Sequence, residues 1–416
     1  AVVGRLPGAE YMGAVAIGAV IMNVIYSSLN FLRMGTTGLT AQSFGAGDAD
    51  QMRSWLARAC LLSAVLGLGL IALQLPILGV SHWLMGASDA VWPLTESYFQ
   101  IRIWGAPAAL LNFALLGWFF GVQNMRAALI TQVFLNGLNI VLDVWFVLGL
   151  GWGVDGVAWA TIISEYAAVA LGLWLAVRQL AKLGGRWRWD RIRDTSRIRR
   201  MLGVNRDIFI RSMCLQAAFV VFTSAGTRMG DEVLAANALL LQFSMFTAYA
   251  LDGFANAAEA MVGQAVGAHD RTLFRQAVKI TTGWSIVFAL MFMVAYWLFG
   301  TAIIDVLSTV PVVRETAYAY LPWMVALPVI AVWSFQFDGI FIGATWTREM
   351  RNSMAMSFAA FAVAVPLVTA TWGNHGLWAA FTVFMSLRGV TMGLMLPKLA
   401  RGVGVGPRPD GSGDGP

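Results

Sequence analysis

Apolar stretches, each about as long as the roughly 20 residues that a helix needs to cross a bilayer, follow one another along almost the whole chain. This pattern restricts the possible folds more than any other feature of the sequence. Charged residues make up only 12% of the chain, about half of the ~25% found in globular proteins. The sequence lacks the short alternating strands of a transmembrane β-barrel. It therefore predicts an all-α polytopic membrane protein.

The hydropathy pattern predicts eleven membrane spans. The residues before the turn at Pro7-Gly8 are too few for a span, so we interpret them as the end of a first helix that is mostly missing from this chain. The predicted spans are residues 10–44, 54–80, 90–121, 127–149, 155–178, 206–227, 233–266, 273–300, 312–343, 352–372 and 376–397.

Basic residues are concentrated on one side of these spans. Their densest group, LGGRWRWDRIRDTSRIRR, lies between the fifth and sixth spans. Lys and Arg beside membrane helices mark the cytoplasmic side, and Trp187 and Trp189 in this segment are typical of interfacial anchors. The loops on the opposite side then hold only Arg5, Arg228 and Arg314. We therefore expect the central linker and the C-terminus to be cytoplasmic.

The two halves of the chain repeat one another. The motif QSFGAGD at 42–48 recurs as QAVGAHD at 264–270, and GWFFG at 117–121 recurs as GIFIG at 339–343, both at the same offset along the chain. Two repeated six-helix halves are a recurrent transporter architecture. The predicted organisation is an N-terminal bundle (1–178), a basic cytoplasmic linker (179–205), a C-terminal bundle (206–400) and a disordered, Gly- and Pro-rich cytoplasmic tail (401–416).

Acidic residues inside the predicted spans are the strongest functional signal. An ionised carboxylate at the centre of a membrane helix costs roughly 3 kcal/mol, so each must either pair with a positive charge or bind a proton or ion as its function. Pairing that only braces the bundle is the simpler alternative, because Arg33, Arg102, Arg211 and Arg388 are also predicted within spans. The embedded acids are Asp143, Glu165, Asp252, Glu259 and Asp338.

Polar side chains accompany these acids on one helix face in each half. Their spacings, i, i+3, i+7 in the first half and i, i+4, i+7 in the second, place each set on a single face. Thr161 and Glu165, at i and i+4, share a face of the following helix. A cavity lined by such faces would suit a cationic or amphipathic substrate that competes with H⁺ or Na⁺. The two sets are Asn136, Asn139 and Asp143, and Asp252, Asn256 and Glu259.

Other classes of function lack support in the sequence. No HExxH, GxSxG or embedded Ser/His pair indicates an enzyme. Cys60, Cys214 and the three histidines are scattered, so neither a metal site nor a disulfide framework is predicted. The net charge of +6 does not indicate nucleic-acid binding, because no recognised binding module accompanies it.

With these residues in view, the chain resembles the multidrug and toxic compound extrusion (MATE) family, specifically its DinF-like branch. The resemblance covers essentially the whole chain and rests on several segments taken together: AVVGRLPGAEYMGAVAIG, FLRMGTTGLTAQSFGAGD, LNIVLDVWFVLGLGWGVDGVAWAT, ALDGFANAAEAMVGQAVGAHD and FDGIFIGATWTREMRNSM.

The resemblance implies specific site residues. In similar members, an Asp of the first helix forms a cation site with an Asn, an Asp and a Thr of the fifth and sixth helices. Asn139, Asp143 and Thr161 match the last three in type and spacing, and the Asp would lie one to three residues before Ala1. Asp252, Glu259 and Asp338 match acidic positions characteristic of the branch's second bundle. Together with residues of the polar faces described above, the possible substrate or coupling cavity comprises Asn136, Glu165, Asp252, Asn256, Glu259 and Asp338.

The resemblance also implies a fold and an activity. These are two six-helix bundles, and drug export driven by H⁺ or Na⁺, without any other cofactor. We expect a monomer in a bacterial plasma (inner) membrane, with organic cations or amphipathic drugs and membrane lipid as its partners. The alternative is a flippase for a lipid-linked oligosaccharide or another lipid. Such proteins tend to line their cavity with several cationic residues, whereas the embedded stripes here are acidic.

Overall fold

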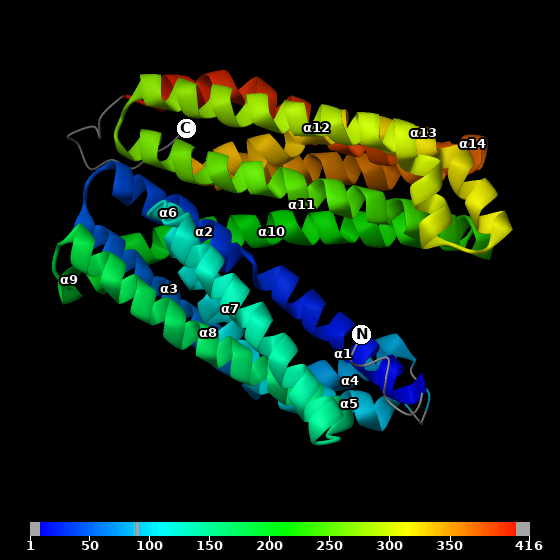
Figure 1. Cartoon of the computed structure of the whole chain (residues 1–416). Helices are drawn as coiled ribbons and strands as arrows, with labels where there is room; N and C mark the ends of the chain where they lie inside the picture. Colours follow the sequence, from blue (N-terminus) through cyan, green and yellow to red (C-terminus); the bar gives the residue numbers. More distant parts are fainter. Residues whose placement is uncertain (1–8, 87, 89–90, 405–416) are drawn as a thin grey trace. The chain divides into compact units, whose positions relative to one another are not determined.

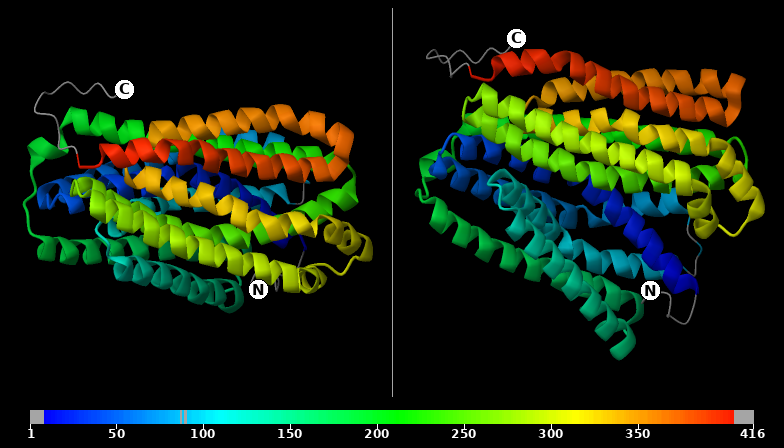
Figure 2. Two further views of the ribbon diagram at one scale, coloured as in Figure 1. Left: turned by 90° about the horizontal axis from the view of Figure 1, so that it is seen from above. Right: turned by 45° about the horizontal axis from the view of Figure 1, so that its top comes forward.

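The computed structural model describes residues 9–86, 88 and 91–404, and this part of the chain is helical almost throughout, without strands (Figure 1). Ten of its helices are long and apolar enough to cross a membrane. The last, α14 (Thr347–Gly402), folds back at Gly373, where φ is 55° and ψ is −135°, and Figure 2 shows its two arms in orange and red. Counting the arms separately gives the eleven predicted spans, so the all-α membrane fold is confirmed.

The described residues form two compact units. Unit 1 comprises the chain up to Thr40 together with Asp48–Asn205, and unit 2 comprises Ala41–Gly47 together with the chain from Arg206 onward. The predicted remnant of a first helix, and residues 405–416 of the predicted disordered tail, lie outside the described residues.

Unit 1 contains several helices that are broken within one predicted span. The span predicted at 54–80 is interrupted at Leu73, just before Pro76, and the span at 90–121 passes through a 3₁₀ turn just before Pro107. Proline lacks an N–H and its ring clashes with the preceding turn, so a helix breaks on its N-terminal side. The helices are α1 (Ala9–Leu29), α2 (Phe31–Gly45), α3 (Ala49–Ala72), α4 (Gln74–Met85), α5 (Trp92–Arg102), α6 (Ala106–Gly121), α7 (Met125–Asp143), α8 (Gly153–Leu183) and α9 (Trp189–Ile192).

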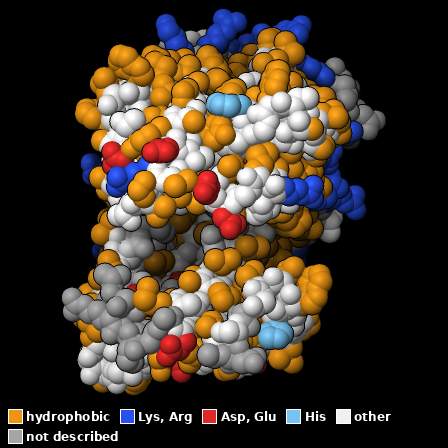
Figure 3. Space-filling view, turned by 90° about the vertical axis from the view of Figure 1, so that its right-hand side faces the viewer, with side chains coloured by type: hydrophobic (Ala, Val, Ile, Leu, Met, Phe, Trp, Pro, Cys, Tyr) orange, Lys and Arg blue, Asp and Glu red, His pale blue; other side chains and the backbone are white. Residues whose placement is uncertain are grey.

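Unit 2 is built from fewer and longer helices. Its core is aromatic, and Phe222, Phe361, Trp378, Phe381 and Phe384 are buried in one cluster. Figure 3 shows the molecule from the right-hand side of Figure 1, where hydrophobic side chains are interspersed with other polar side chains and several acidic ones. The helices are α10 (Thr195–Thr227, which starts in unit 1), α11 (Asp231–Gly267), α12 (Arg271–Leu307), α13 (Pro311–Gly343) and α14.

The internal repeat is reproduced in the backbone. The Asp that ends each copy of the motif caps the next helix: the Asp48 carboxylate accepts a hydrogen bond of 3.0 Å from the Gln51 N–H, and that of Asp270 one of 2.7 Å from the Thr272 N–H. Left-handed backbone recurs at matching positions of the two copies: Gly47 (φ 66°) with His269 (54°), and Gln123 (57°) with Thr345 (57°).

The repeated motif also packs against its own copy. A Cβ atom at Gly45 would overlap the backbone oxygen of Gln264, and a Cβ atom at Gly267 would overlap that of Gln42. Glycine at both positions therefore allows the last turns of α2 and α11 to cross in backbone contact. The Gln42 Nε2 adds a hydrogen bond of 3.1 Å to the Gly343 backbone oxygen. These contacts explain why the last turn of α2 belongs to unit 2.

Candidate functional site

Helices α7 and α8 bring together Asn139 and Thr161, two of the three residues that were predicted to bind a proton or cation. The Asn139 Nδ2 on α7 donates a hydrogen bond of 3.2 Å to the Thr161 Oγ1 on α8. The Thr161 hydroxyl in turn donates to the Val157 backbone oxygen, 2.9 Å away within its own helix. Asp143 lies one helical turn beyond Asn139 and is the last residue of α7.

The backbone changes directly after Asp143. Residues Val144–Gly149 form a π-helical turn instead of continuing the α-helix. Such turns are rare and are frequent at functional sites. The following Gly151 and Gly153 have φ values of 69° and 56°, which glycine adopts without strain, and they allow the chain to return into α8.

The Asp143 carboxylate is partly buried and forms no ion pair with a basic side chain of the described residues. Its Oδ1 atom is buried and accepts no hydrogen bond, and within the described residues the side chain forms no ion pair with Lys or Arg. Buried polar atoms are nearly always hydrogen-bonded, so an unsatisfied carboxylate oxygen in a membrane span is a place where a proton or a small cation would be stabilised.

Glu165, also predicted as a possible site residue, is engaged differently. The Arg102 guanidinium on α5 donates two hydrogen bonds to its carboxylate, from Nη2 to Oε1 at 2.9 Å and from Nη1 to Oε2 at 3.1 Å. Both side chains are nearly buried, at 7% and 9% exposure. A Cβ atom at Gly105 would contact both partners, so this glycine makes room for the pair. The structure thus shows Glu165 in the bracing arrangement that the sequence left open.

Asn136 is exposed, and its Nδ2 donates to the Gln132 backbone oxygen of the same helix at 2.9 Å. It shares the α7 face of Asn139 but does not contact Thr161 in this structure. Tyr98, which was not predicted, is buried on α5 within electrostatic range of Asp143. Nothing in the sequence distinguishes this tyrosine from others in apolar spans.

Unit 2 contains a second buried charge cluster. The Asp338 Oδ2 on α13 accepts hydrogen bonds from the Arg388 Nη2 on α14, at 2.7 Å, and from the Arg211 Nη2 on α10. Arg388 is only 1% exposed, and Asp252 on α11 lies within its electrostatic range. Asp338 therefore holds three helices of unit 2 together.

The remaining predicted residues follow one another along α11. Asp252 is exposed, Asn256 is partly buried and Glu259 is buried. Within the described ranges, no group of three or more His, Cys, Asp or Glu residues could hold a metal ion. The oxygen atoms of Asn139, Asp143 and Thr161 are the best candidates for binding H⁺ or a hard monovalent cation, because such ions prefer oxygen ligands.

Comparison with known proteins places this geometry in context. The MatE family model matches residues 1–145 and 208–369. The DNA damage-inducible protein F of Escherichia coli (strain K12) is 44% identical over 401 residues, which cover 94% of this chain and 85% of the relative. Protein DETOXIFICATION 42 of Arabidopsis thaliana is 27% identical over 342 residues, covering 79% of this chain and 63% of the plant protein.

Solved structures show the same fold. A MOP superfamily transporter from Pyrococcus furiosus superimposes with a TM-score of 0.84 at 20% identity, covering 95% of this chain and 89% of that chain. A multidrug resistance MATE family transporter in an outward-facing conformation gives a TM-score of 0.83 at 19% identity, with coverage of 95% and 89%.

Proposed function

The chain belongs to the MatE family of membrane transporters, and from this premise we propose that it is a secondary antiporter. It exports organic cations or amphipathic drugs in exchange for H⁺ or, alternatively, Na⁺. Members of this family are transporters and not enzymes. The multi-pass membrane fold and the multidrug names of several relatives support this proposal.

The unsatisfied carboxylate of Asp143 carries the assignment of the coupling site. Two other embedded acids, Glu165 and Asp338, already accept hydrogen bonds from arginines. An arginine cannot release its proton near neutral pH, so each of those acids already has a fixed positive partner. Asp143 has no such partner in the part of the chain that the structure describes, and it can therefore exchange one positive ion for another.

The local structure supports a mechanism. A proton or cation on Asp143 removes the cost of a bare charge in the membrane, and Asn139, one turn earlier on α7, and its hydrogen-bond partner Thr161 would supply neutral oxygens. The regular α-helix ends at Asp143, where the π-helical turn begins, so this is the point at which occupancy of the site would change the end of α7. We propose that this change reshapes the N-terminal bundle and releases substrate outward.

The proposal includes an orientation of the protein in the membrane. We place the protein as a monomer in a bacterial plasma membrane, with the linker between α8 and α10 and the C-terminus in the cytoplasm. The basic residues of the linker, of the start of α12 and of the end of α14 support this orientation.

The experiment uses the complete gene product in proteoliposomes loaded with ethidium, under a pH gradient or a Na⁺ gradient applied separately. Asp143→Asn is expected to reduce driven efflux to the level of empty vesicles at normal expression. Glu96→Gln is the matched control, because among the described residues this carboxylate forms no ion pair and accepts a hydrogen bond from the Gln100 side chain one turn away, at 3.0 Å. Unchanged ethidium or norfloxacin efflux in Asp143→Asn would refute the role of Asp143. Flipping of a lipid-linked oligosaccharide without drug efflux would favour the flippase alternative.

A further inference from the structure

The end of α8 and the linker that follows it carry an exposed set of tryptophans and basic residues. We call this set the basic rim. The Trp174 and Trp187 side chains are each 50% exposed, and that of Trp189 is 70% exposed. The basic rim consists of Trp174, Arg178, Lys182, Trp187, Trp189 and Arg193, all within unit 1.

Each tryptophan of the basic rim is stacked against an arginine. The distances from guanidinium carbon to ring centre are 4.0 Å for Arg178 and Trp174, 5.5 Å for Arg53 and Trp187, and 5.9 Å for Arg193 and Trp189. Trp174, Arg178 and Lys182 are also spaced i, i+4, i+8, so they follow one face of α8. Ring and charge are thus presented together, as at a membrane–water interface.

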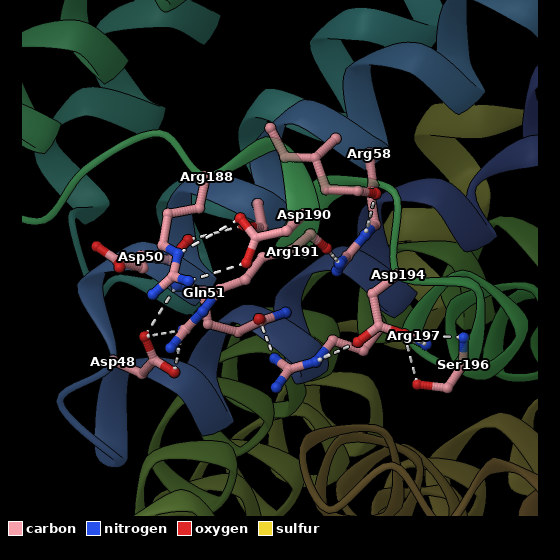
Figure 4. A network of polar contacts seen from close by, with 12 residues as sticks. Asp48, Asp50, Gln51, Arg58, Arg188, Asp190, Arg191, Asp194, Ser196 and Arg197 are labelled. Atoms are coloured by element: carbon pink, nitrogen blue, oxygen red, sulfur yellow. Dashed lines mark hydrogen bonds and ion pairs between the residues drawn. The ribbon is translucent and has the colours of Figure 1, made fainter.

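The linker is fixed in this position by polar contacts with α3 (Figure 4). The Arg191 Nη1 donates to both carboxylate oxygens of Asp48 at 2.8 Å, and the Arg58 Nε donates to the Ile192 backbone oxygen at 3.1 Å. Ile192, the last residue of α9, is itself buried. At the start of the linker, the Arg53 guanidinium donates a hydrogen bond of 2.9 Å to the Gly184 backbone oxygen. The exposed rings are therefore held in place by the fold.

The acidic residues of this region already form hydrogen bonds or ion pairs within the linker and with the start of α3. Besides Asp48, the Asp50 carboxylate accepts from the Arg186 N–H at 2.7 Å, and Asp190 pairs with Arg188 at 2.9 Å. Asp194 accepts from the Ser196 N–H at 2.9 Å and pairs with Arg197. By contrast, the basic side chains of the rim itself, Arg178, Lys182 and Arg193, form no ion pair within the described chain. The region therefore presents unneutralised positive charge outward.

The position of the basic rim at the end of a membrane span indicates which negatively charged partner it binds. Leu173 and Val177, next to Trp174 and Arg178 on α8, are apolar and exposed, at 40% and 64%. The positive charges thus begin where the lipid-facing surface of a membrane span ends. A negative partner at that level is the phosphate layer of the bilayer, whereas a soluble acidic macromolecule would not account for the apolar surface that continues below.

We propose that the basic rim is a docking surface for the headgroups of anionic phospholipids. Arg178, Lys182 and Arg193 contact the phosphate and anionic groups, while the tryptophans lie among the glycerol and headgroup atoms. This docking anchors the linker to the membrane surface. It requires only that the helices span a membrane, and so it stands independently of the coupling site.

The test measures lipid retention by the full-length protein in native mass spectrometry, with phosphatidylglycerol and phosphatidylcholine of equal acyl chains. The wild type is expected to retain phosphatidylglycerol preferentially. One basic residue near an anionic surface contributes about a fivefold preference for anionic lipid. In the variant Arg178→Gln/Lys182→Gln/Arg193→Gln, the preference for phosphatidylglycerol should therefore fall by up to roughly a hundredfold.

The matched control neutralises three exposed basic residues of unit 2 that have no tryptophan stacked against them, Arg275→Gln/Arg348→Gln/Lys398→Gln. It is expected to keep most of the preference. If the wild type shows no preference for phosphatidylglycerol, the proposal is overturned whether or not the variants fold. An equal loss of this preference in the basic-rim variant and in the unit 2 control would overturn it as well. A second variant, Trp174→Leu/Trp187→Leu/Trp189→Leu, keeps every charge and should also weaken retention.

Discussion

The buried pair of Arg102 and Glu165 allows a quantitative test of which embedded acids brace the bundle. The change is Arg102→Met, which removes two charge-assisted hydrogen bonds of 2.9 and 3.1 Å. Because the two side chains are only 7% and 9% exposed, the Glu165 carboxylate would remain buried without a partner. Breaking a buried pair on one side costs about 3–5 kcal/mol, and we expect the free energy of unfolding to fall by this amount.

The double variant Arg102→Met/Glu165→Leu gives the decisive comparison. Replacing a whole buried pair by apolar residues of similar volume is often neutral or even stabilising by ~1–4 kcal/mol. The double variant should therefore recover the lost stability and, if Glu165 only braces the bundle, retain drug efflux.

The assay is equilibrium unfolding in mixed detergent micelles for the wild type, both single variants and the double variant, together with ethidium efflux from proteoliposomes. Arg188→Met serves as the control, since its ion pair with Asp190 is half exposed and its loss should leave stability unchanged. A double variant as unstable as Arg102→Met would refute the bracing account. A stable double variant without efflux would show that Glu165 takes part in transport.

Two further predictions concern the helix crossing and the linker. Gly45→Ala places a methyl group against the Gln264 backbone oxygen, so we expect a loss of about 1–3 kcal/mol in the same unfolding assay. Gly283→Ala, where nothing lies within 4 Å of a Cβ atom, should be neutral or stabilising, and equal effects would contradict the close crossing. In the linker, the hydrogen bond from Arg188 lowers the pKa of Asp190, and that from Ser196 lowers the pKa of Asp194. The stabilisation of the linker by these two carboxylates is complete above the usual Asp pKa of about 3.9 and is lost only as the pH falls through the lowered values. Hydrogen-exchange protection of residues 186–194, corrected for intrinsic rates, should therefore be equal at pH 8 and pH 5. Lost protection at pH 5 would contradict this.

Much of the fold could be predicted because its signals are local or repeated. Span length is set by hydropathy, and the two copies of the motif confirm each other at a constant offset. The break before Pro107 was not predicted, because the hydropathy pattern predicts one span at 90–121, although proline cannot continue the helix that precedes it and so gives a local signal. The grouping of Asn139 with Thr161 was implied by the family resemblance, whose site residues the two match in type and spacing.

The pairing of the embedded charges could not be predicted in the same way. Glu165 joins Arg102 across 63 residues, and Asp338 joins Arg211 across 127 residues. Several acids and several arginines allow many combinations, and only the packing of helices decides among them. The isolation of Asp143 is likewise a property of the folded molecule, because in the sequence it resembles the other acids.

The crossing of α2 and α11 has a consequence for how the molecule is made. Gln264 contacts Gly45, and Gly267 contacts Gln42, so each of the two later residues lies half a chain beyond its partner. At a synthesis rate of ~5–20 residues per second, the last turn of α2 leaves the ribosome about 10–45 s before its packing partner exists. The first bundle must therefore be inserted and kept in the membrane with one helix end unfinished, and the emergence of α11 is the event that completes both halves.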